Sequence, residues 1–275
     1  MTTRRGILTA GLVAGAGTLL AGPARAALPV VDMEAALKAA QWDPEKSGTG
    51  ITPGAKASVL LIEQALVARG LLATSYADGH FGSKTVAAYA AWQRSLGYSG
   101  IGANGLPGAA SLTALGRNRF TVRRTIAPGT KSQYQGWTVN ARTLAMLRAA
   151  ENRWGGGQFV VEQGSYAPGV DPTSAGSHDG GGALDLDAEA LSPGLRTAAL
   201  VALREVGFAA WLRNPSQANW PWHIHAIAIS DPDLAPLAAR QAGAYYEGRN
   251  GLASNLPDDG PAVPKVTYEE FRRGA

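Results

Sequence analysis

The sequence predicts two folded domains, a small all-α domain of three helices followed by an α+β domain with a small antiparallel sheet. Over residues 57–116, apolar side chains recur at helical spacing and the helical stretches stop at glycines. Over residues 120–250, short segments typical of strands alternate with helical stretches and glycine-rich loops. We expect residues 27–56 to form a linker before these domains and residues 251–275 to form a loose tail after them.

The first 26 residues, 1–26, have the pattern of a twin-arginine signal peptide. Arg4 and Arg5 precede an uncharged stretch over residues 7–20, and Ala24-Arg25-Ala26 is a small-x-small cleavage site. The paired arginines favour the export route for folded proteins, which predicts a periplasmic or extracellular, cell-wall-associated protein. A membrane anchor is the alternative, but about 15 apolar residues are too few to span a bilayer comfortably.

Composition narrows the classes of partner and of metal ligand. Without Arg4, Arg5 and Arg25, the chain carries 22 basic and 21 acidic residues, so its charge gives no reason to expect a nucleic acid partner. No later segment is apolar enough to predict a membrane span, so no membrane partner is expected after cleavage. The chain has no cysteine, which leaves His, Asp and Glu as ligands for a transition metal.

Within the linker, residues 33–42 form a short amphipathic stretch. The first helix of the α domain carries Val59, Ile62 and Leu66 on one face. The second begins with Ser83 as its N-cap, and the third is short and stops at a glycine.

Glycines at fixed offsets mark the loops of this domain. Asp78 to Thr85 reads D-G-x-F-G-x-x-T, an aromatic-Gln pair follows at Trp92-Gln93, and Gly105 to Gly116 reads G-x-P-G-x-x-S-L-x-x-L-G. At these residues the segment resembles the three-helix peptidoglycan-binding domain found beside many cell-wall hydrolases. The resemblance covers about 60 residues and implies that peptidoglycan is a partner of the protein.

In the α+β domain, Asn140 is expected to begin a helix as its N-cap, and Ser192-Pro193 to open a second. A last helix is expected from near Asp233 towards Tyr246. The segments that predict strands are residues 159–161, 182–187, 208–212 and 223–229.

Three of the four histidines fall in two short segments of this domain. His178 precedes a glycine run that lets the backbone fold tightly, and Asp185 lies in the strand beyond it. His223 and His225 are two residues apart on a strand, so their side chains share one face. Since histidine and carboxylate are the zinc ligands that remain when thiolates are absent, the pattern favours a metal site.

The segment from His178 to Asp185 matches the H-x-x-G-x-A-x-D motif of zinc D-alanyl-D-alanine carboxypeptidases. His223 and His225 match the H-x-H pair of the wider superfamily, which the domain therefore resembles and which also holds lysostaphin-type endopeptidases and the hedgehog signalling domain. The resemblance implies that His178, Asp185 and His225 bind Zn²⁺ and that water fills the fourth position. It places His223 beside that water as the catalytic residue.

Two features of the carboxypeptidases are absent from the sequence. They carry Asp or Glu as general base three residues before the last zinc ligand, whereas this chain has Trp222 there and no carboxylate between Val206 and Ser230. They also hold the terminal carboxylate of the substrate with an arginine after the first strand, and none lies between Trp154 and Leu195. Lysostaphin-type enzymes lack that acid too and rely on the first histidine of H-x-H, so the comparison favours an endopeptidase.

The sequence thus predicts an exported zinc metallopeptidase that cleaves peptidoglycan stem or cross-bridge peptides, with His223 moving a proton. The alternative is a non-catalytic cell-wall-binding protein whose zinc domain is structural or binds a ligand. A third interpretation takes the four candidate residues as ordinary loop and strand positions. The reserve acids are Glu162, Asp179 and Asp187, and the aromatic residues that either line the substrate groove or pack in the core are Tyr166, Trp220 and Trp222.

Overall fold

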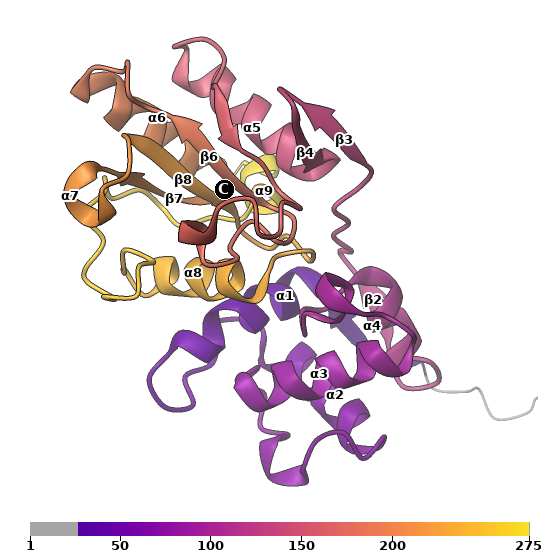
Figure 1. Cartoon of the computed structure of the whole chain (residues 1–275). Helices are drawn as coiled ribbons and strands as arrows, with labels where there is room; N and C mark the ends of the chain where they lie inside the picture. The colour runs from indigo at the N-terminus through magenta and orange to yellow at the C-terminus, as the bar shows by residue number, and fades with distance from the viewer. Residues whose placement is uncertain (1–26, 275) are drawn as a thin grey trace, which may run out of the picture.

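The computed structural model describes residues 27–274, and the expected signal peptide lies outside the described residues. In Figure 1 the N-terminal helices lie below a twisted sheet, and further helices lie above it. Within residues 27–274, none of the helices has both the length and the apolar character that a bilayer crossing requires.

The helices are α1 (Met33–Trp42), α2 (Lys56–Val67), α3 (Ser83–Ser95), α4 (Ala109–Leu115), α5 (Ala141–Trp154), α6 (Pro193–Glu205), α7 (Pro215–Ala218), α8 (Pro236–Tyr246) and α9 (Tyr268–Arg272). The strands are β1 (Val30–Asp32), β2 (Thr121–Arg123), β3 (Lys131–Tyr134), β4 (Trp137–Asn140), β5 (Val161–Gln163), β6 (Ala183–Asp187), β7 (Phe208–Arg213) and β8 (His223–Ala228).

The main sheet has four strands in the order β5-β6-β8-β7, and every neighbouring pair is antiparallel. Strand β5 begins two residues later than the sequence predicts. Strands β1 and β2 form a separate parallel pair, and β3 and β4 form an antiparallel pair. The N-caps expected at Asn140 and Ser192 are confirmed, since their side chains accept from Thr143 N and Leu195 N.

The two faces of the main sheet have different neighbours because successive side chains of a strand point to opposite faces. One face packs against α5 and α6 through an apolar layer that includes Leu186, Phe208 and Ile224. The opposite face contacts α8 and an apolar cluster that continues into α1 and α2. The side chains on the α8 face include Ala183, Asp185 and Asp187 of β6, Ala209, Trp211 and Arg213 of β7, and His223, His225 and Ile227 of β8.

The three helices α2, α3 and α4 pack around buried apolar side chains that include Ile62, Tyr89 and Leu112. Ser83 is the first residue of α3 rather than its N-cap, and the cap position Gly82 has no side chain to accept a hydrogen bond. The buried Glu63 of α2 holds the loop before α3 instead. Its carboxylate accepts from Gly79 N and from Thr85 Oγ1.

Residues 27–56 differ from the expected linker. Helix α1 packs against α8, and Gln41 Oε1 accepts from Ser230 N at 3.0 Å. The buried Asp43 accepts from Thr52 N at 2.8 Å and from Phe81 N at 3.0 Å. Glycine and proline are frequent at the C-terminal end of this segment. Apolar residues of α1 nevertheless fill the space between the sheet and the helical unit of α2, α3 and α4, so the two parts share one core.

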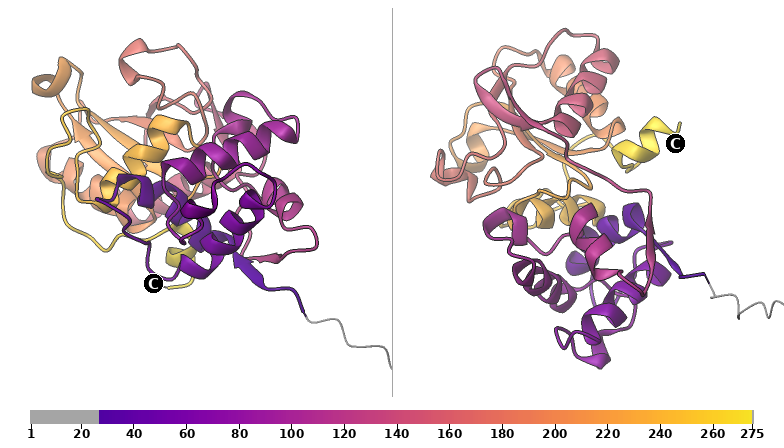
Figure 2. Two further views of the ribbon diagram at one scale, coloured as in Figure 1. Left: turned by 90° about the horizontal axis from the view of Figure 1, so that it is seen from below. Right: turned by 90° about the vertical axis from the view of Figure 1, so that its right-hand side faces the viewer.

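Residues 251–274 also differ from the expected loose tail, because they supply carboxylates to buried arginines. Arg204 of α6 is paired with Asp258 at 2.8 Å, and Arg142 of α5 is paired with Glu269 at 2.8 Å. A buried guanidinium without a carboxylate partner is costly, so these pairs hold the C-terminal segment against α5 and α6. Figure 2 shows α9 beside the domain rather than extended from it.

Candidate metal centre

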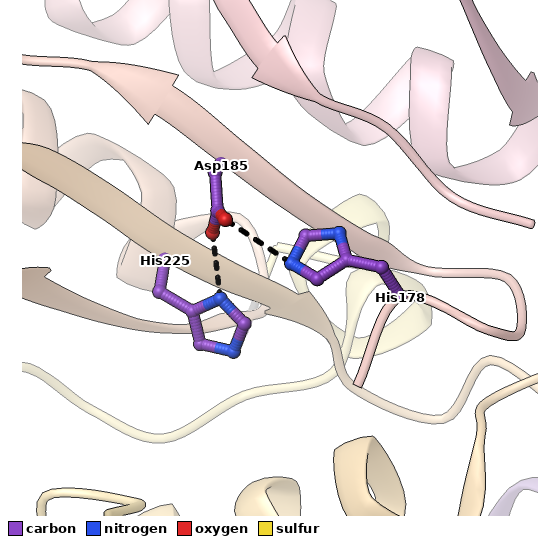
Figure 3. A group of neighbouring side chains, drawn as sticks. All are labelled: His178, Asp185 and His225. Atoms are coloured by element: carbon purple, nitrogen blue, oxygen red, sulfur yellow. Dashed lines mark hydrogen bonds and ion pairs between the residues drawn. The ribbon is translucent and has the colours of Figure 1, made fainter. Parts of the chain in front are cut away.

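Three side chains from two strands and a loop converge on the α8 face of the sheet. His178 lies in the loop before β6, Asp185 lies on β6 and His225 lies on β8, and one ligand atom of each lies within 4.8 Å of the others. Both histidines are buried, and Asp185 is partly exposed. Figure 3 shows the Asp185 carboxylate between the two imidazole rings.

The glycine run after His178 packs closely against the loop that follows β8. A Cβ on Gly180 would lie 2.3 Å from Asp233 O, and the Gly181 N–H donates to the same carbonyl at 2.8 Å. Gly182 has a φ of +79°, in the left-handed region that favours glycine. The run thus returns the chain sharply into β6 and leaves His178 beside that strand.

Strand register brings the other two residues together. Asp185 and His225 are directly opposite in the antiparallel pair of β6 and β8. Opposed side chains on one face of such a pair lie within contact distance. The Asp185 Oδ1 and His225 Nδ1 atoms are 2.7 Å apart.

A backbone carbonyl fixes the tautomer of His178. Its Nδ1 lies 2.9 Å from Gly164 O, and since a carbonyl oxygen only accepts, Nδ1 carries the proton. The lone pair of a neutral ring is then on Nε2, which is buried without a hydrogen-bond donor or acceptor partner among the described residues. That nitrogen lies 3.3 Å from Asp185 Oδ2.

A glutamine on α8 orients His225 in the same way. His225 Nε2 lies 3.1 Å from Gln241 Oε1, and Gln241 Nε2 donates to Gly251 O at 3.1 Å. The second contact turns the amide oxygen towards the ring, so His225 Nε2 donates the hydrogen bond and Nδ1 keeps the lone pair. Supporting contacts of this kind orient the imidazole ligands of metal sites.

When both rings are neutral, each therefore directs an unprotonated nitrogen at one carboxylate. Lone pairs that face an anionic oxygen across 2.7 Å and 3.3 Å repel it unless a cation lies among them. Two imidazole nitrogens and a carboxylate oxygen fit a metal ion, and three protein ligands leave one tetrahedral position for water or substrate. His178, Asp185 and His225 could therefore hold a metal ion.

The pKa shifts of Asp185 and His225 suit this role, whereas at His178 a metal ion would have to compete with a proton. Burial alone would raise the pKa of Asp185, but His225 and His178 hold it well below its usual range. Burial would lower the pKa of His178, yet Asp185 raises it above the ordinary value. For His225, burial outweighs Asp185 and the pKa is lowered. Asp185 is therefore anionic and His225 neutral at neutral pH, as metal binding requires.

A cavity of about 730 Å³ opens over this group, and His223 lies on its wall. His223 is partly exposed on the same strand face as His225, and its Nδ1 donates to Pro221 O at 2.9 Å. Its Nε2 is then the nitrogen free to exchange a proton. The ring of Trp220 meets the His223 ring edge-on, with 6.0 Å between the centroids.

The other candidates lie in different places. Trp220 lines the cavity, whereas Trp222 packs under the Arg196 guanidinium, and Tyr166 donates to Asp233 Oδ2 away from the cavity wall. None of the three reserve acids is among the described residues that line the cavity. Burial raises the pKa of Glu162, and Asp187 raises it further while His223 opposes the shift.

Sequence reasoning missed three residues that shape the site, Trp211, Arg213 and Gln241. The first two alternate along β7 on the same face as His225, and strand periodicity alone could have placed them there. Gln241 lies in the expected last helix, but nothing in its spacing indicates a contact with a histidine 16 residues earlier.

Comparisons of this chain with protein-family models, with curated proteins and with solved structures gave no match.

Proposed function

We propose that this protein is an exported zinc metallopeptidase that cleaves stem or cross-bridge peptides of peptidoglycan, as an endopeptidase rather than a D,D-carboxypeptidase. The observation that carries the proposal is the position of His178, Asp185 and His225 on the wall of one cavity, with His223 on the same strand face. A structural zinc site is closed by four protein ligands, whereas a catalytic one keeps a position for water or substrate.

The donor set supports zinc as the metal. Two imidazoles and one carboxylate, in a chain without cysteine, form a ligand set of catalytic zinc sites. Bound there, zinc would supply Lewis acidity, which polarises a peptide carbonyl and activates water at neutral pH.

We call His178, Asp185 and His225 the metal group. The side chains around it would position the substrate and move the proton. His223 would accept a proton from the attacking water and return it to the leaving amine. It would use Nε2 for this, because Nδ1 is engaged with Pro221 O. Trp220 would hold the His223 ring in place from the cavity side.

The helical unit of α2, α3 and α4 would bind the polymer. This assignment depends on the glycine-bearing motifs of its loops, and three large apolar side chains of this unit, Tyr76, Leu96 and Tyr98, are exposed. Asn104 Nδ2 donates to Pro232 O at 2.8 Å and to Leu234 O at 3.0 Å, so the unit is attached to the segment between β8 and α8. Binding there would raise the concentration of peptide at the cavity without adding a catalytic contact.

Digestion of purified sacculi by the mature, zinc-loaded protein tests the proposal. We expect soluble fragments whose masses show hydrolysis of a peptide bond, and none from a His178→Ala variant that cannot hold the metal. Fragments in which the glycan bonds are cut and the peptides are intact would contradict the proposal that a peptide bond is cleaved. Sedimentation with sacculi but no release would favour the cell-wall-binding alternative, in which the metal site is structural or receives a ligand.

A further inference from the structure

A buried arginine lies on the wall of the same cavity. Arg213 is the last residue of β7, directly opposite His223 of β8, and it shares the sheet face of His225 and Asp185. It is 2% exposed. Since opposed residues of antiparallel strands have neighbouring Cβ atoms, its side chain begins beside that of the proposed proton-transfer residue.

The hydrogen bonds of this guanidinium are incomplete. Arg213 Nη2 donates to Asn250 O at 2.9 Å, and the group lies over the Trp211 ring, 5.2 Å from its centroid. Arg213 Nη1 is buried and has no hydrogen-bond partner among the described residues. A buried charged donor left unpaired is unfavourable, so the missing acceptor requires a physical reason.

The other large buried arginines of the domain are paired differently. Arg204 and Arg142 each have a carboxylate of the C-terminal segment at 2.8 Å. Within residues 27–274, no carboxylate lies within 4.0 Å of Arg213. Burial lowers the pKa of Arg213 to about 10, so the group remains a cation at neutral pH.

We infer that Arg213 binds a carboxylate of the ligand, so that the cavity takes peptides with a free carboxylate close to the bond at the metal group. The inference deepens the proposed function and depends on it for the position of that bond. Guanidinium N–H groups match carboxylate oxygens, and the pair forms most favourably where water is excluded. The carboxylate is either an acidic side chain, which fits the proposed endopeptidase, or a chain terminus, which would make the enzyme a carboxypeptidase. Both sources would present the same group to the guanidinium.

Three small probes separate these sources without any turnover. They are N-acetylalanine, its amide, and the α-amide of N-acetylaspartate, whose only carboxylate is on the side chain. Titration calorimetry with the zinc-loaded mature protein should show at least one acid binding about 10- to 100-fold more tightly than the amide, as a charged hydrogen bond allows. The acid that binds more tightly identifies the source.

Variants of two arginines make the assignment decisive. Arg213→Gln should bind acid and amide alike, and Arg213→Lys, which keeps the charge, should retain part of the preference. Arg240→Gln is the matched control, because Arg240 is an exposed arginine of α8 that lines the same cavity, and its preference should stay unchanged. Zinc content and melting temperature report whether each variant is folded.

Two results would overturn the inference: equal binding of acids and amide by the unaltered protein, or a preference for acid that survives in Arg213→Gln. The second would mean that the carboxylate binds the metal or another group. Because these titrations need no hydrolysis, they fail or succeed independently of sacculus digestion.

Discussion

Asp185 Oδ1 lies 2.7 Å from His225 Nδ1 across the pair of β6 and β8, while the other nitrogen of the same ring faces Gln241 Oε1 at 3.1 Å. A neutral imidazole has one N–H, so it cannot donate to both acceptors. The orientation of Gln241 assigns that proton to Nε2, and a metal ion bound to Nδ1 and Asp185 would satisfy the second contact. Gln241 is therefore as much a part of the site as its ligands.

Replacing Gln241 by Leu should weaken zinc binding about 10- to 100-fold, the usual effect of losing a residue that orients a ligand. The apolar side chain leaves His225 Nε2 without an acceptor and lets the other tautomer form. Competition with a chromogenic chelator measures the affinity. Gln241→Glu keeps an acceptor at this place and should bind zinc more tightly than Gln241→Leu; equal loss in both variants would contradict the role assigned to the amide oxygen.

The carboxylate that holds the C-terminal segment should matter for stability. Asp258→Ala leaves the buried guanidinium of Arg204 without its anion, and we expect a loss of about 3 kcal/mol in the free energy of unfolding, measured in urea. The pair of Arg153 and Glu205 is exposed, so Glu205→Ala should cost less than about 1 kcal/mol. Similar losses in the two variants would mean that the tail is not held by this ion pair.

Glu63 should make stability depend on pH. Burial raises its pKa to about 7, although Gly79 N and Thr85 Oγ1 donate to it. Because the folded protein then binds the proton more tightly than the unfolded chain, this contribution is complete below about pH 4.5 and is lost as the pH rises towards 7.

The predicted change is at most about 3 kcal/mol, from the difference between the two pKa values. Glu63→Gln cannot titrate, so the variant should lose this part of the pH dependence in urea unfolding between pH 4.5 and 7. Parallel stability curves for the two proteins would show that the pKa of Glu63 is not raised.

The metal group could be predicted from the sequence because the pattern that indicates it lies within two short segments. A histidine before three glycines, an acid in the next strand and two histidines at strand spacing fix which side chains can meet. The strand register that sets Asp185 opposite His225 depends on the whole sheet, and the sequence predicted the meeting of these residues without predicting that register.

Other features depend on contacts between distant segments, and spacing could not predict them. Gly251 O orients Gln241, and the carbonyl of Asn250 accepts from Arg213, so the residues after α8 support the site although composition suggested a loose tail. Residues 27–56 look like a linker because glycine and proline are frequent at their C-terminal end. The apolar face of α1 becomes informative only when α8 is beside it.

The paired variants His223→Ala and His225→Ala test the central claim, a catalytic metal group with an adjacent proton carrier, most directly. For each, zinc content is measured beside the rate of peptide release from sacculi. We expect His223→Ala to keep zinc and fold but to lose about 10²- to 10⁴-fold in rate, the usual contribution of general acid–base catalysis. His225→Ala should lose the metal itself. If His223→Ala loses zinc as fully as His225→Ala, the site is closed by four protein ligands and the account of a catalytic centre is contradicted.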